Sequence, residues 1–460
     1  MKPQDFDPGS LARDVRGKVL TPGDIGYDEA RALWNAMIDR RPAAIVRSRD
    51  ARDVRSAVAA AVKAGLPIAI RGGGHNIAGL GLCDGGLVVD LSDMRAVTVD
   101  RRAGTVSAQG GALLKDLDAA AQREGLVVPG GVVSSTGIAG LTLGGGFGWL
   151  SRSLGLTADN LLAAELVDAA GRLLTVDAQS HPDLLWALRG GGGNFGVVTR
   201  FTFRAHALAH PVLFGPTVHR LDDAPAVLRH YRDFCAQAPR DCCVWADLCT
   251  APPLPFLAPQ HHGTKVVILM QCFRGDPHEG ERVLAPLREF GRPLGDAVAP
   301  TAVCEAQSRL DDTYAHGARN YWGSQSYRAL DDATIDRLVA LAHTLPSAES
   351  DILLSQLGGA IDDVAADESA YPHRGIAFIV SAGARWRDPS DDARCIDWIR
   401  QANARLASGA SGNAYVNFEP ETQASGRRVY GGSLPRLRRI KQRYDPANAF
   451  CVNHNIEPNR

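Results

Sequence analysis

Three glycine-rich loops constrain the fold of this chain more than any other feature, and all lie within its first 200 residues. They are residues 72–74, 144–148 and 190–196. Glycine brings no side chain for packing, and it is used where φ must be positive or where backbone must approach another group closely. Because bare backbone N–H groups bind anionic oxygens, we expect the loops to hold a long ligand with a central pyrophosphate, with residues 144–148 approaching the pyrophosphate.

A histidine follows the first loop, and the segment around the second loop is the most glycine-rich of the chain. His75 projects an imidazole from residues 71–76. Taken alone, this stretch is equally compatible with a surface turn that carries an incidental histidine. Residues 129–148 contain too much glycine for a plain strand or helix, so we expect backbone wrapped around an extended ligand.

Length and composition indicate a soluble protein of more than one domain. The chain has 460 residues, too many for one ordinary core, so two or three domains are expected. Its residues are 45% hydrophobic and 22% charged, and its formal net charge is −1, which favours neither nucleic acid nor an anionic membrane as partner. Nine cysteines without C-x-x-C or zinc spacing, and an N-terminus without a signal-peptide pattern, predict reduced thiols in a cytoplasmic protein without a bound metal.

The pattern of the chain changes at three places. Residues 1–37 are expected to form a helical lead-in. Residues 38–207 hold all three glycine loops between short apolar strands. Glycine becomes rarer from about residue 208, and residues 208–410 are expected to form a second α+β domain, with a strand over 265–273 and a helix over 331–343. Residues 411–460 are a distinct tail that contains a basic helix over 434–444.

Several common catalytic motifs are absent or stand in the wrong context. Residues 191–196 fit G-x-G-x-x-G, but they follow a predicted helix and precede a predicted strand, which is the reverse of a Rossmann dinucleotide site. No serine lies in a G-x-S-x-G elbow, and there is no H-E-x-x-H motif. The adjacent pair His261 and His262 is expected in a solvated loop. These patterns disfavour a nicotinamide site of the Rossmann type, a serine hydrolase and a zinc protease.

Five separated motifs resemble those of the berberine bridge enzyme-like FAD-linked oxidases, within the vanillyl-alcohol oxidase superfamily. The motifs occur in the family's order and cover most of residues 38–208 and 411–460, whereas the middle of the chain matches weakly. They are residues 71–76, 137–148, 155–160, 184–196 and 441–456.

The resemblance implies an α+β fold: a two-lobed, PCMH-type FAD-binding domain over 38–207, and a substrate domain over 208–410 whose antiparallel sheet is covered by helices. Residues 411–460 would then return to the FAD domain. It also implies FAD joined covalently to His75 through the 8α-methyl group, since neutral imidazole is a competent nucleophile. On matching positions, the residues expected to bind the cofactor are Arg71, Gly72, Gly73, Gly74, His75, Asn76, Gly79, Gly137, Gly140, Gly144, Gly145, Gly146, Phe147, Gly148, Asp159, Gly193, Asn194, Gly196, Val198, Asn453 and Asn455.

The sequence departs from the family's pattern at two places. Many members carry a second flavin link from a cysteine, but Val133 stands at the matching position, so a single attachment is expected. The family often has Y-x-N-Y in the tail, and here the last tyrosine is replaced in Tyr415-Val416-Asn417-Phe418. One of two tyrosines able to serve as a base is therefore absent.

The leading interpretation is an oxidase that takes hydride from a C–H next to an alcohol or amine of a small molecule and passes the electrons to O2, giving H2O2. Tyr415 is the first candidate for the base and Tyr371 the second; for each, the alternative is a core tyrosine with a satisfied hydroxyl. A nearby cation, Arg374 or Arg71, is expected to lower the phenol's pKa. Two other functions stay open: a flavin-dependent reductase using NAD(P)H, and a non-catalytic flavin-binding protein.

Overall fold

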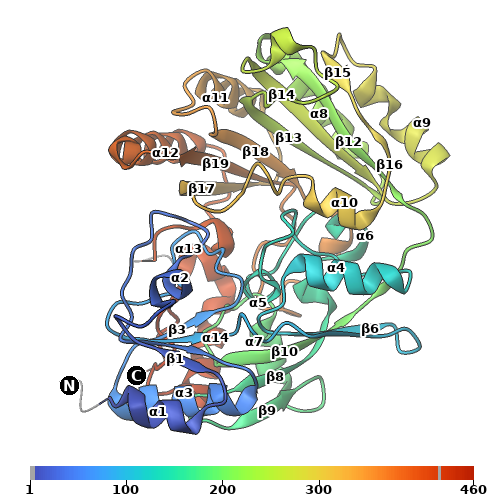
Figure 1. Ribbon diagram of the computed structural model, residues 1–460. Helices are drawn as coiled ribbons and strands as arrows, with labels where there is room; N and C mark the ends of the chain where they lie inside the picture. The colour runs from blue at the N-terminus through green and yellow to red at the C-terminus, as the bar shows by residue number, and fades with distance from the viewer. Residues whose placement is uncertain (1–5, 423–425, 460) are drawn as a thin grey trace.

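The computed structural model describes residues 6–422 and 426–459, which form two stacked units (Figure 1). The lower unit in that view contains the elements from α1 to β11, and the upper unit contains those from β12 to α12. The end of the chain, from η6 to α14, returns to the lower unit. The lower unit is therefore built from both ends of the chain.

The first lobe of the lower unit is a four-stranded sheet with the order β1-β2-β4-β3. β2, β4 and β3 are parallel, and β1 pairs antiparallel to β2. The sequence offers Asp50 or Ser48 as a cap for a helix that begins at Ala51, and the structure uses Asp50, whose carboxylate accepts the N–H groups of Arg52 and Asp53. Gly65 ends the helix in the left-handed region. The elements are α1 (Pro8–Asp14), β1 (Lys18–Leu20), α2 (Tyr27–Arg31), β2 (Ala44–Arg47), α3 (Ala51–Ala64), β3 (Ile68–Arg71) and β4 (Leu87–Asp90).

Two details of this lobe differ from the sequence-based expectations. The described part of the expected helical lead-in also contains β1, which extends the sheet instead of standing apart from it. On α3, the spacing of Val54, Val58 and Val62 predicts one buried face, but only Val54 and Val58 are buried and Val62 is 41% exposed. Eight residues after Val54 the helix has turned about 80° beyond two full turns, so Ala61 occupies the buried face in place of Val62.

The second lobe of the lower unit is a five-stranded antiparallel sheet with the order β5-β6-β10-β8-β9, beside a two-stranded pair of β7 and β11. The sequence predicts a hairpin over residues 97–108, from their alternating pattern, and another over residues 161–176, and both form. The elements are β5 (Val97–Asp100), β6 (Thr105–Gln109), α4 (Leu114–Arg123), β7 (Leu126–Val127), α5 (Ile138–Leu143), α6 (Ser151–Leu154), η1 (Ala158–Asn160), β8 (Leu161–Val167), β9 (Leu173–Val176), α7 (Pro182–Leu188), β10 (Val197–Arg204) and β11 (His206–Ala207).

The glycine-rich segment 129–148 contains a helix, contrary to expectation. α5 occupies its centre, where the sequence Ile-Ala-Gly-Leu-Thr-Leu holds a single glycine. Ile138, Ala139, Thr142 and Leu143 are buried on one side, so tertiary packing stabilises a turn and a half that glycine content alone disfavours.

The upper unit is an eight-stranded sheet in which every pairing is antiparallel, as predicted. The strand order is β15-β12-β14-β13-β18-β19-β17, with β16 beside β12. The elements are β12 (Val212–Arg220), η2 (Leu221–Asp223), α8 (Ala224–Gln237), β13 (Cys242–Thr250), η3 (Pro259–His261), β14 (Lys265–Phe273), α9 (Pro277–Arg288), β15 (Gly295–Asp296), β16 (Ala299–Thr301), α10 (Val303–Ser308), β17 (Arg319–Tyr327), α11 (Asp332–Ala342), β18 (Asp351–Gln356), η4 (Gly359–Ile361), β19 (Phe378–Trp386), η5 (Pro389–Asp391) and α12 (Asp392–Leu406).

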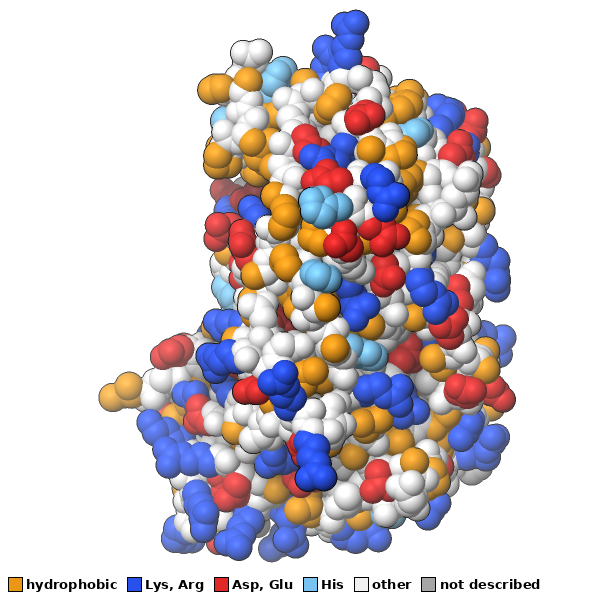
Figure 2. Space-filling view, turned by 90° about the vertical axis from the view of Figure 1, so that its right-hand side faces the viewer, with side chains coloured by type: hydrophobic (Ala, Val, Ile, Leu, Met, Phe, Trp, Pro, Cys, Tyr) orange, Lys and Arg blue, Asp and Glu red, His pale blue; other side chains and the backbone are white. Residues whose placement is uncertain are grey.

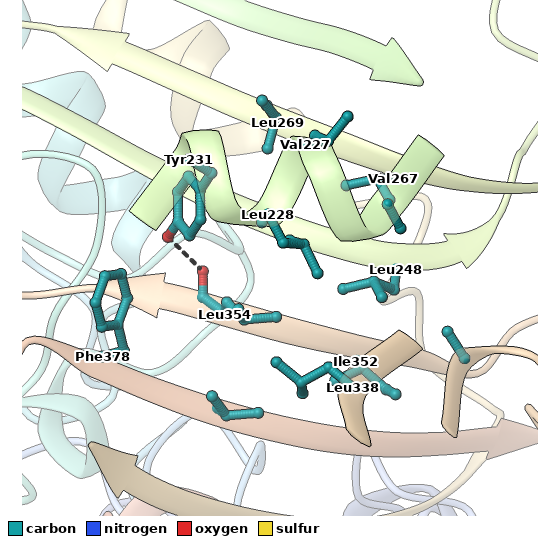
Figure 3. Packing of buried hydrophobic residues seen from close by; sticks show 14 of the residues in the cluster. Val227, Leu228, Tyr231, Leu248, Val267, Leu269, Leu338, Ile352, Leu354 and Phe378 are labelled. Carbon is teal, nitrogen blue, oxygen red and sulfur yellow. Dashed lines mark hydrogen bonds between the residues drawn. The ribbon is translucent and has the colours of Figure 1, made fainter. Parts of the chain in front are cut away.

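Helices α8, α9, α11 and α12 cover the outer face of this sheet (Figure 1). Val227, Leu228 and Tyr231 of α8 point onto the strands, and the Tyr231 hydroxyl lies near the Leu354 carbonyl oxygen (Figure 3). The inner face packs toward the lower unit through a second apolar cluster that includes Trp149 and Trp245. The sheet therefore forms a wall above the glycine loops.

The tail fastens the third glycine loop. It consists of η6 (Val416–Phe418), α13 (Gly426–Tyr430), η7 (Gly431–Ser433) and α14 (Leu434–Tyr444). The fully buried Lys441 ammonium pairs with Asp445 at 2.6 Å and donates to the carbonyl oxygens of Asn194 at 2.7 Å and Phe450 at 3.0 Å. A buried charge with three such partners holds the tail against residues 190–196.

The surface carries charges of both signs. On the face shown in Figure 2, Lys and Arg side chains are most numerous over the lower half and are interspersed with carboxylates. In the described part of the chain, no helix combines the length and the apolar character that crossing a lipid bilayer requires.

Asp118 on α4 gives a prediction for stability. It is 4% exposed beside Gln307 of α10, and burial raises its pKa from about 3.8 to about 7, an effect the Gln307 amide partly opposes. The folded state thus favours the protonated acid. The contribution of protonated Asp118 to the free energy of unfolding is therefore fully present below about pH 4 and decreases as the pH rises to about 7. The total decrease in the free energy of unfolding reaches up to roughly 4 kcal/mol.

Asp118→Asn cannot ionise and should escape this loss. In urea unfolding, the free energy of unfolding of the variant, relative to that of the wild type, should be higher at pH 8 than at pH 4.5. Glu124→Gln, which removes an exposed carboxylate at the end of the same helix, is the control. An Asp118→Asn advantage that does not grow with pH would contradict the prediction.

Candidate functional site

One cavity runs between the glycine loops of the lower unit and the inner face of the upper sheet. Its wall brings together segments far apart in the chain: the β3 loop, the segment around α5, the third glycine loop, the upper sheet and the tail. Of the residues predicted to act here, those in the wall are Arg71, Gly72, Gly73, Gly74, His75, Asn76, Gly137, Gly140, Gly144, Phe147, Gly193, Gly196, Val198, Tyr415 and Asn453.

The first glycine loop offers a row of free backbone donors. Among the described residues, no acceptor receives the N–H groups of residues 72–76. Gly73 also packs backbone against backbone, since a Cβ there would lie 2.3 Å from the Gly137 nitrogen. Buried N–H groups in native proteins are almost always paired, so a consecutive free row facing a cavity is the arrangement that anionic ligand oxygens require.

The imidazole of His75 lies in the wall beside this row. Its Nε2 is 2.9 Å from Ser135 Oγ, its ring stacks on Trp34 at 5.3 Å, and the His316 ring meets its edge at 5.3 Å. Burial, with a smaller contribution from the charge of His316, lowers the pKa of His75 to about 3. The ring is therefore neutral at physiological pH and able to act as a nucleophile.

Arg71, Asn76 and Gly79 shape the loop in different ways. Arg71 lines the cavity and donates through Nη1 to the Ala30 carbonyl, while its buried Nε has no partner in the described part of the chain. Asn76 Oδ1 accepts the N–H groups of Ala78 and Leu80, both at 3.1 Å, and so closes the turn. Gly79 lies outside the wall, against Ile38. Asn76 and Gly79 thus position the loop.

The second glycine loop does not offer the bare donors expected of a pyrophosphate cradle. The N–H groups of Gly144, Gly145, Gly146 and Gly148 all donate within the protein, to Gly140 O, Thr142 O, Tyr415 Oη and Ser151 Oγ. Only Gly144 and Phe147 of this loop line the cavity. A Cβ on Gly145, whose φ is +118°, would lie 2.7 Å from the Tyr371 ring. Bare backbone here allows close packing under Tyr371, and among the described residues only the Phe147 N–H of this loop is left without an acceptor. The expectation that residues 144–148 offer a row of bare donors is therefore wrong.

The third glycine loop divides between the cavity and the tail. Gly193, Gly196 and Val198 line the cavity, but Asn194 does not. Asn194 Nδ2 donates to the Gly191 carbonyl at 3.0 Å, and its Oδ1 accepts the Ile456 N–H at 2.9 Å. Its amide is thus used to dock the tail.

Two tail asparagines carry buried carbonyl oxygens without partners among the described residues. Asn453 lines the cavity, and its Nδ2 donates to the Phe450 carbonyl at 3.0 Å, while its Oδ1 is free. Asn455 Oδ1 is also free, but Asn455 is outside the wall. An orphan acceptor in a cavity wall suits a ligand N–H, which favours Asn453 over Asn455 as a ligand contact.

Asp159 and Tyr371 lie behind the wall. The Asp159 carboxylate forms a buried ion pair with Arg374 at 2.5 Å and accepts the Leu156 N–H. The Arg374 guanidinium lies 5.2 Å from the centre of the Tyr371 ring. Burial strongly raises the pKa of Tyr371, whose hydroxyl has no partner among the described residues. The structure therefore gives neither residue direct access to a ligand.

Tyr415 faces the cavity with its hydroxyl held by two donors. The Gly146 N–H donates to Tyr415 Oη at 3.0 Å and the Asn417 amide donates at 2.9 Å. Burial raises the pKa of Tyr415 to about 12, and these two donors oppose that rise. Arg374 is bound to Asp159 and Arg71 to Ala30, so the expected cation beside the phenol is missing in the described structure. The expectation that Arg374 or Arg71 lowers this pKa is wrong.

Several wall residues from the upper unit and the lead-in were missed by reasoning from the sequence. Trp34 stacks on His75, and Tyr314, Trp322 and Asp351 complete the side opposite the glycine loops. The signal available was weak: Trp34 and Tyr314 lie in irregular loops, and Asp351 opens a strand whose next three residues are apolar. Their convergence depends on the pairing of strands distant in sequence.

Comparisons with known proteins agree with this geometry. A family model described as FAD binding domain matches residues 42–177, and one described as berberine and berberine like matches residues 414–457. The FAD-linked oxidoreductase YgaK of Bacillus subtilis is 31% identical over 454 residues, covering 97% of this chain and 98% of the relative. The chain belongs to the FAD-linked oxidoreductases.

Two further comparisons cover nearly the whole length of this FAD-linked oxidoreductase. The (R)-6-hydroxynicotine oxidase of Paenarthrobacter nicotinovorans is 29% identical, covering 96% of the chain and 97% of the relative. The crystal structure of 6-hydroxy-D-nicotine oxidase from Arthrobacter nicotinovorans superposes with a TM-score of 0.88 at 26% identity, covering 99% of both chains. These likenesses confirm the predicted family and fold class.

The wall residues fit FAD. The free N–H row of residues 72–76 suits anionic oxygens, and the orphan Asn453 Oδ1 suits an N–H of a ring system. In addition, a Cβ on Gly140 or Gly193 would meet no protein atom within 4 Å, so the wall is open in front of both. The cavity thus combines polar backbone, an orphan acceptor and open space.

Proposed function

We propose that this FAD-linked oxidoreductase is an oxidase, which removes hydride from a C–H next to an alcohol or amine and delivers two electrons and two protons to O2, giving H2O2. Bound FAD would supply the hydride acceptor and the reaction with oxygen. The observation that carries the proposal is the neutral His75 beside the free N–H row, in a cavity walled on its other side by Tyr415 and aromatic rings. The small-molecule substrate would enter between these two sides.

Attachment of FAD through His75 alone is part of the same proposal. Burial keeps the imidazole neutral, and Ser135 and Trp34 fix its orientation. Val133 lines the cavity where a second link would start, and no cysteine is among the wall residues that the structure describes. Of the residues predicted to bind FAD, we retain those that line the cavity.

The chain's own groups would bind and orient the substrate. Asn417 and the Gly146 N–H hold the Tyr415 oxygen in place, so the phenol can meet a substrate oxygen or nitrogen. The rings of Phe147, Trp322 and Phe418 give this end of the cavity an apolar lining against which the carbon skeleton of a substrate can pack.

The test separates oxidase, reductase and non-catalytic flavin binder. The purified yellow protein is mixed anaerobically first with NADPH and then with a panel of alcohols and amines, and flavin bleaching is followed. Air is then admitted and peroxide is measured. Bleaching by an alcohol or amine with peroxide on reoxidation supports the proposal. Bleaching by NADPH alone would support the reductase, and no bleaching at all would favour a binding protein.

Gly140→Ala tests whether the cofactor occupies the open part of the wall. In α5 the added methyl meets no protein atom and relieves the entropy loss of a helical glycine, worth about 0.5–1 kcal/mol. We therefore expect apo-protein stability to hold or rise while the flavin-to-protein absorbance ratio falls severalfold. Gly432→Ala also meets no protein atom but lies outside the wall, and should keep full flavin content. Full flavin content in Gly140→Ala would place the cofactor elsewhere.

The remaining parts of the proposal concern organisation and location. We assign residues 38–207 and 411–460 to the FAD-binding domain and 208–410 to the substrate domain, since the two family matches fall in the first pair of segments. A cytoplasmic location is supported by the cysteine pattern of the sequence. Protease mapping and localisation of a tagged full-length chain would test these assignments.

A further inference from the structure

An acidic pair lies on the inner face of the upper sheet, with one of its members in the cavity wall. Asp351 opens β18 and lines the cavity, and Asp247 lies on the neighbouring strand β13. The register pairs Asp351 with Cys249, two residues from Asp247, so both carboxyls project from the same face of the sheet. Among the described wall residues, Asp351 is the sole carboxylate.

No cation of the described protein neutralises this pair. Neither carboxyl takes part in a salt bridge with a described residue. The Tyr314 hydroxyl donates to Asp351 Oδ2 at 2.6 Å, whereas Asp247 Oδ1 is buried without a hydrogen-bond partner. Arg385, whose charge acts on Asp351, is itself bound to Glu349 at 3.0 Å. Burial raises the pKa of both acids; the charge of Asp351 adds to the rise at Asp247, and the Tyr314 hydroxyl and Arg385 partly oppose it at Asp351.

A glycine opens the space in front of the acid. Across the sheet, Asp351 pairs with Gly383 of β19, and Gly383 pairs with Trp322 of β17. A Cβ on Gly383 would lie 2.4 Å from Asp351 Oδ1 and 3.4 Å from the indole of Trp322. Since no side chain fills this place, the carboxylate and the indole border the same part of the cavity.

Aromatic rings surround this part of the cavity. Trp322 meets Trp34 at 5.3 Å, Phe418 at 5.7 Å and Tyr314 at 6.0 Å, in each case edge to face. Trp34 in turn stacks on His75, so the aromatic group links the acid to the flavin-attachment end. Indole and phenol faces attract organic cations, most strongly where water is excluded.

We propose that the substrate is a cationic amine whose ammonium group binds Asp351, with Asp247 behind it and the Trp322 ring beside it. The inference rests on the proposed function, because the same cavity must hold the carbon that gives up hydride. A neutral alcohol of the same shape would leave the acid pair without a counter-charge. Charge is therefore the property that separates good from poor ligands at this site.

The test uses two inert probes of matched shape, (3-hydroxyphenyl)trimethylammonium and 3-tert-butylphenol. Neither has a C–H next to an N–H or aliphatic O–H, so binding is measured without turnover. Each is titrated into the flavin-loaded protein at pH 7, and Kd is read from the change in flavin absorbance. The cation should bind at least about tenfold more tightly than its neutral partner, because it gains contacts with a carboxylate and with aromatic faces.

Variants assign the preference to the acid. Asp351→Asn keeps the shape and can still accept from Tyr314, and it should remove most of the preference. Gly383→Ala keeps the charge of Asp351 but displaces its carboxylate, and should lower the ratio of the two Kd values. A purely steric effect of the added methyl group would weaken both probes equally, because they have the same shape, and would leave this ratio unchanged. Asp241→Asn removes a half-exposed carboxylate beside β13, outside the wall, and should leave the ratio of the two Kd values unchanged.

Equal Kd values for the two probes in the wild type, or an undiminished preference in Asp351→Asn, would overturn the inference. A failure of the proposed function is distinguishable from both results. In that case no alcohol or amine reduces the flavin, while the probes can still show the preference for the cation.

Discussion

His75→Ala is expected to leave no flavin on the denatured protein. His75 supplies the neutral imidazole in the cavity wall, and its replacement removes the nucleophile while the free N–H row of the preceding glycines stays in place. After acid precipitation, the wild type should keep its yellow colour in the pellet, and the variant should release it to the supernatant. A tryptic peptide that contains His75 should carry the mass of FAD in the wild type alone.

His316→Ala is the matched control for the attachment. His316 meets the edge of the His75 ring at 5.3 Å, so its loss disturbs the same surroundings without removing the proposed nucleophile. This variant should keep its colour in the pellet. Colour in the wild-type supernatant, or flavin retained by His75→Ala, would show that the attachment is absent or lies at another residue.

The same peptide map tests for a second link. Val133 has no nucleophile, burial raises the pKa of the Cys83 thiol to about 11, and neither Cys83 nor Cys451 lines the cavity. The tryptic peptide of residues 72–95 contains both His75 and Cys83. We therefore expect flavin mass on no other cysteine-containing peptide, and fragmentation of residues 72–95 should place the flavin on His75.

The sequence predicted the fold best where local chemistry decides the structure. The Asp50 cap and the hairpins follow from residues close together in the chain, whereas the antiparallel upper sheet was expected from the family resemblance alone. The first glycine loop also behaves as expected, because its N–H groups stay free.

The site was predicted less well where a residue's role depends on distant partners. Residues 144–148 look like a donor-rich loop in sequence, but Tyr415, 269 positions after Gly146, takes one of its N–H groups. Asp159 is likewise engaged by Arg374, 215 positions away. The acid pair of Asp247 and Asp351 exists only through the register of β13 and β18. Such pairings arise from tertiary packing, which no local pattern encodes.

Tyr415 was chosen from the sequence as the base, and the structure changes the argument for it. Its hydroxyl oxygen accepts from Gly146 and Asn417, and among the described residues no acceptor takes its proton, so the O–H is available to a substrate. The same two donors would stabilise a tyrosinate. Burial nevertheless raises the pKa to about 12, so the deprotonated form is a minor species at neutral pH.

Tyr415→Phe should slow flavin reduction at least about a hundredfold, because general-base help is typically worth 10²–10⁴-fold. Flavin content should not change, since the attachment end of the cavity is untouched. If tyrosinate is the active form, the wild-type reduction rate should rise with pH below a pKa of about 12, and the variant should lose this rise. Stopped-flow reduction between pH 6 and pH 10 measures both effects.

Tyr371→Phe is the matched control for this experiment. Tyr371 is also a buried tyrosine and was the second candidate for the base, but it lies behind the wall, and its hydroxyl has no hydrogen bond to lose among the described residues. Its replacement should therefore leave the reduction rate within a few-fold of the wild type. If Tyr415→Phe lowers the rate less than about tenfold, Tyr415 is a packing residue, and Asp351 becomes the next candidate to accept the proton. A large decrease in the rate of flavin reduction in Tyr371→Phe would instead mean that the cavity wall rearranges to admit Tyr371 when substrate binds.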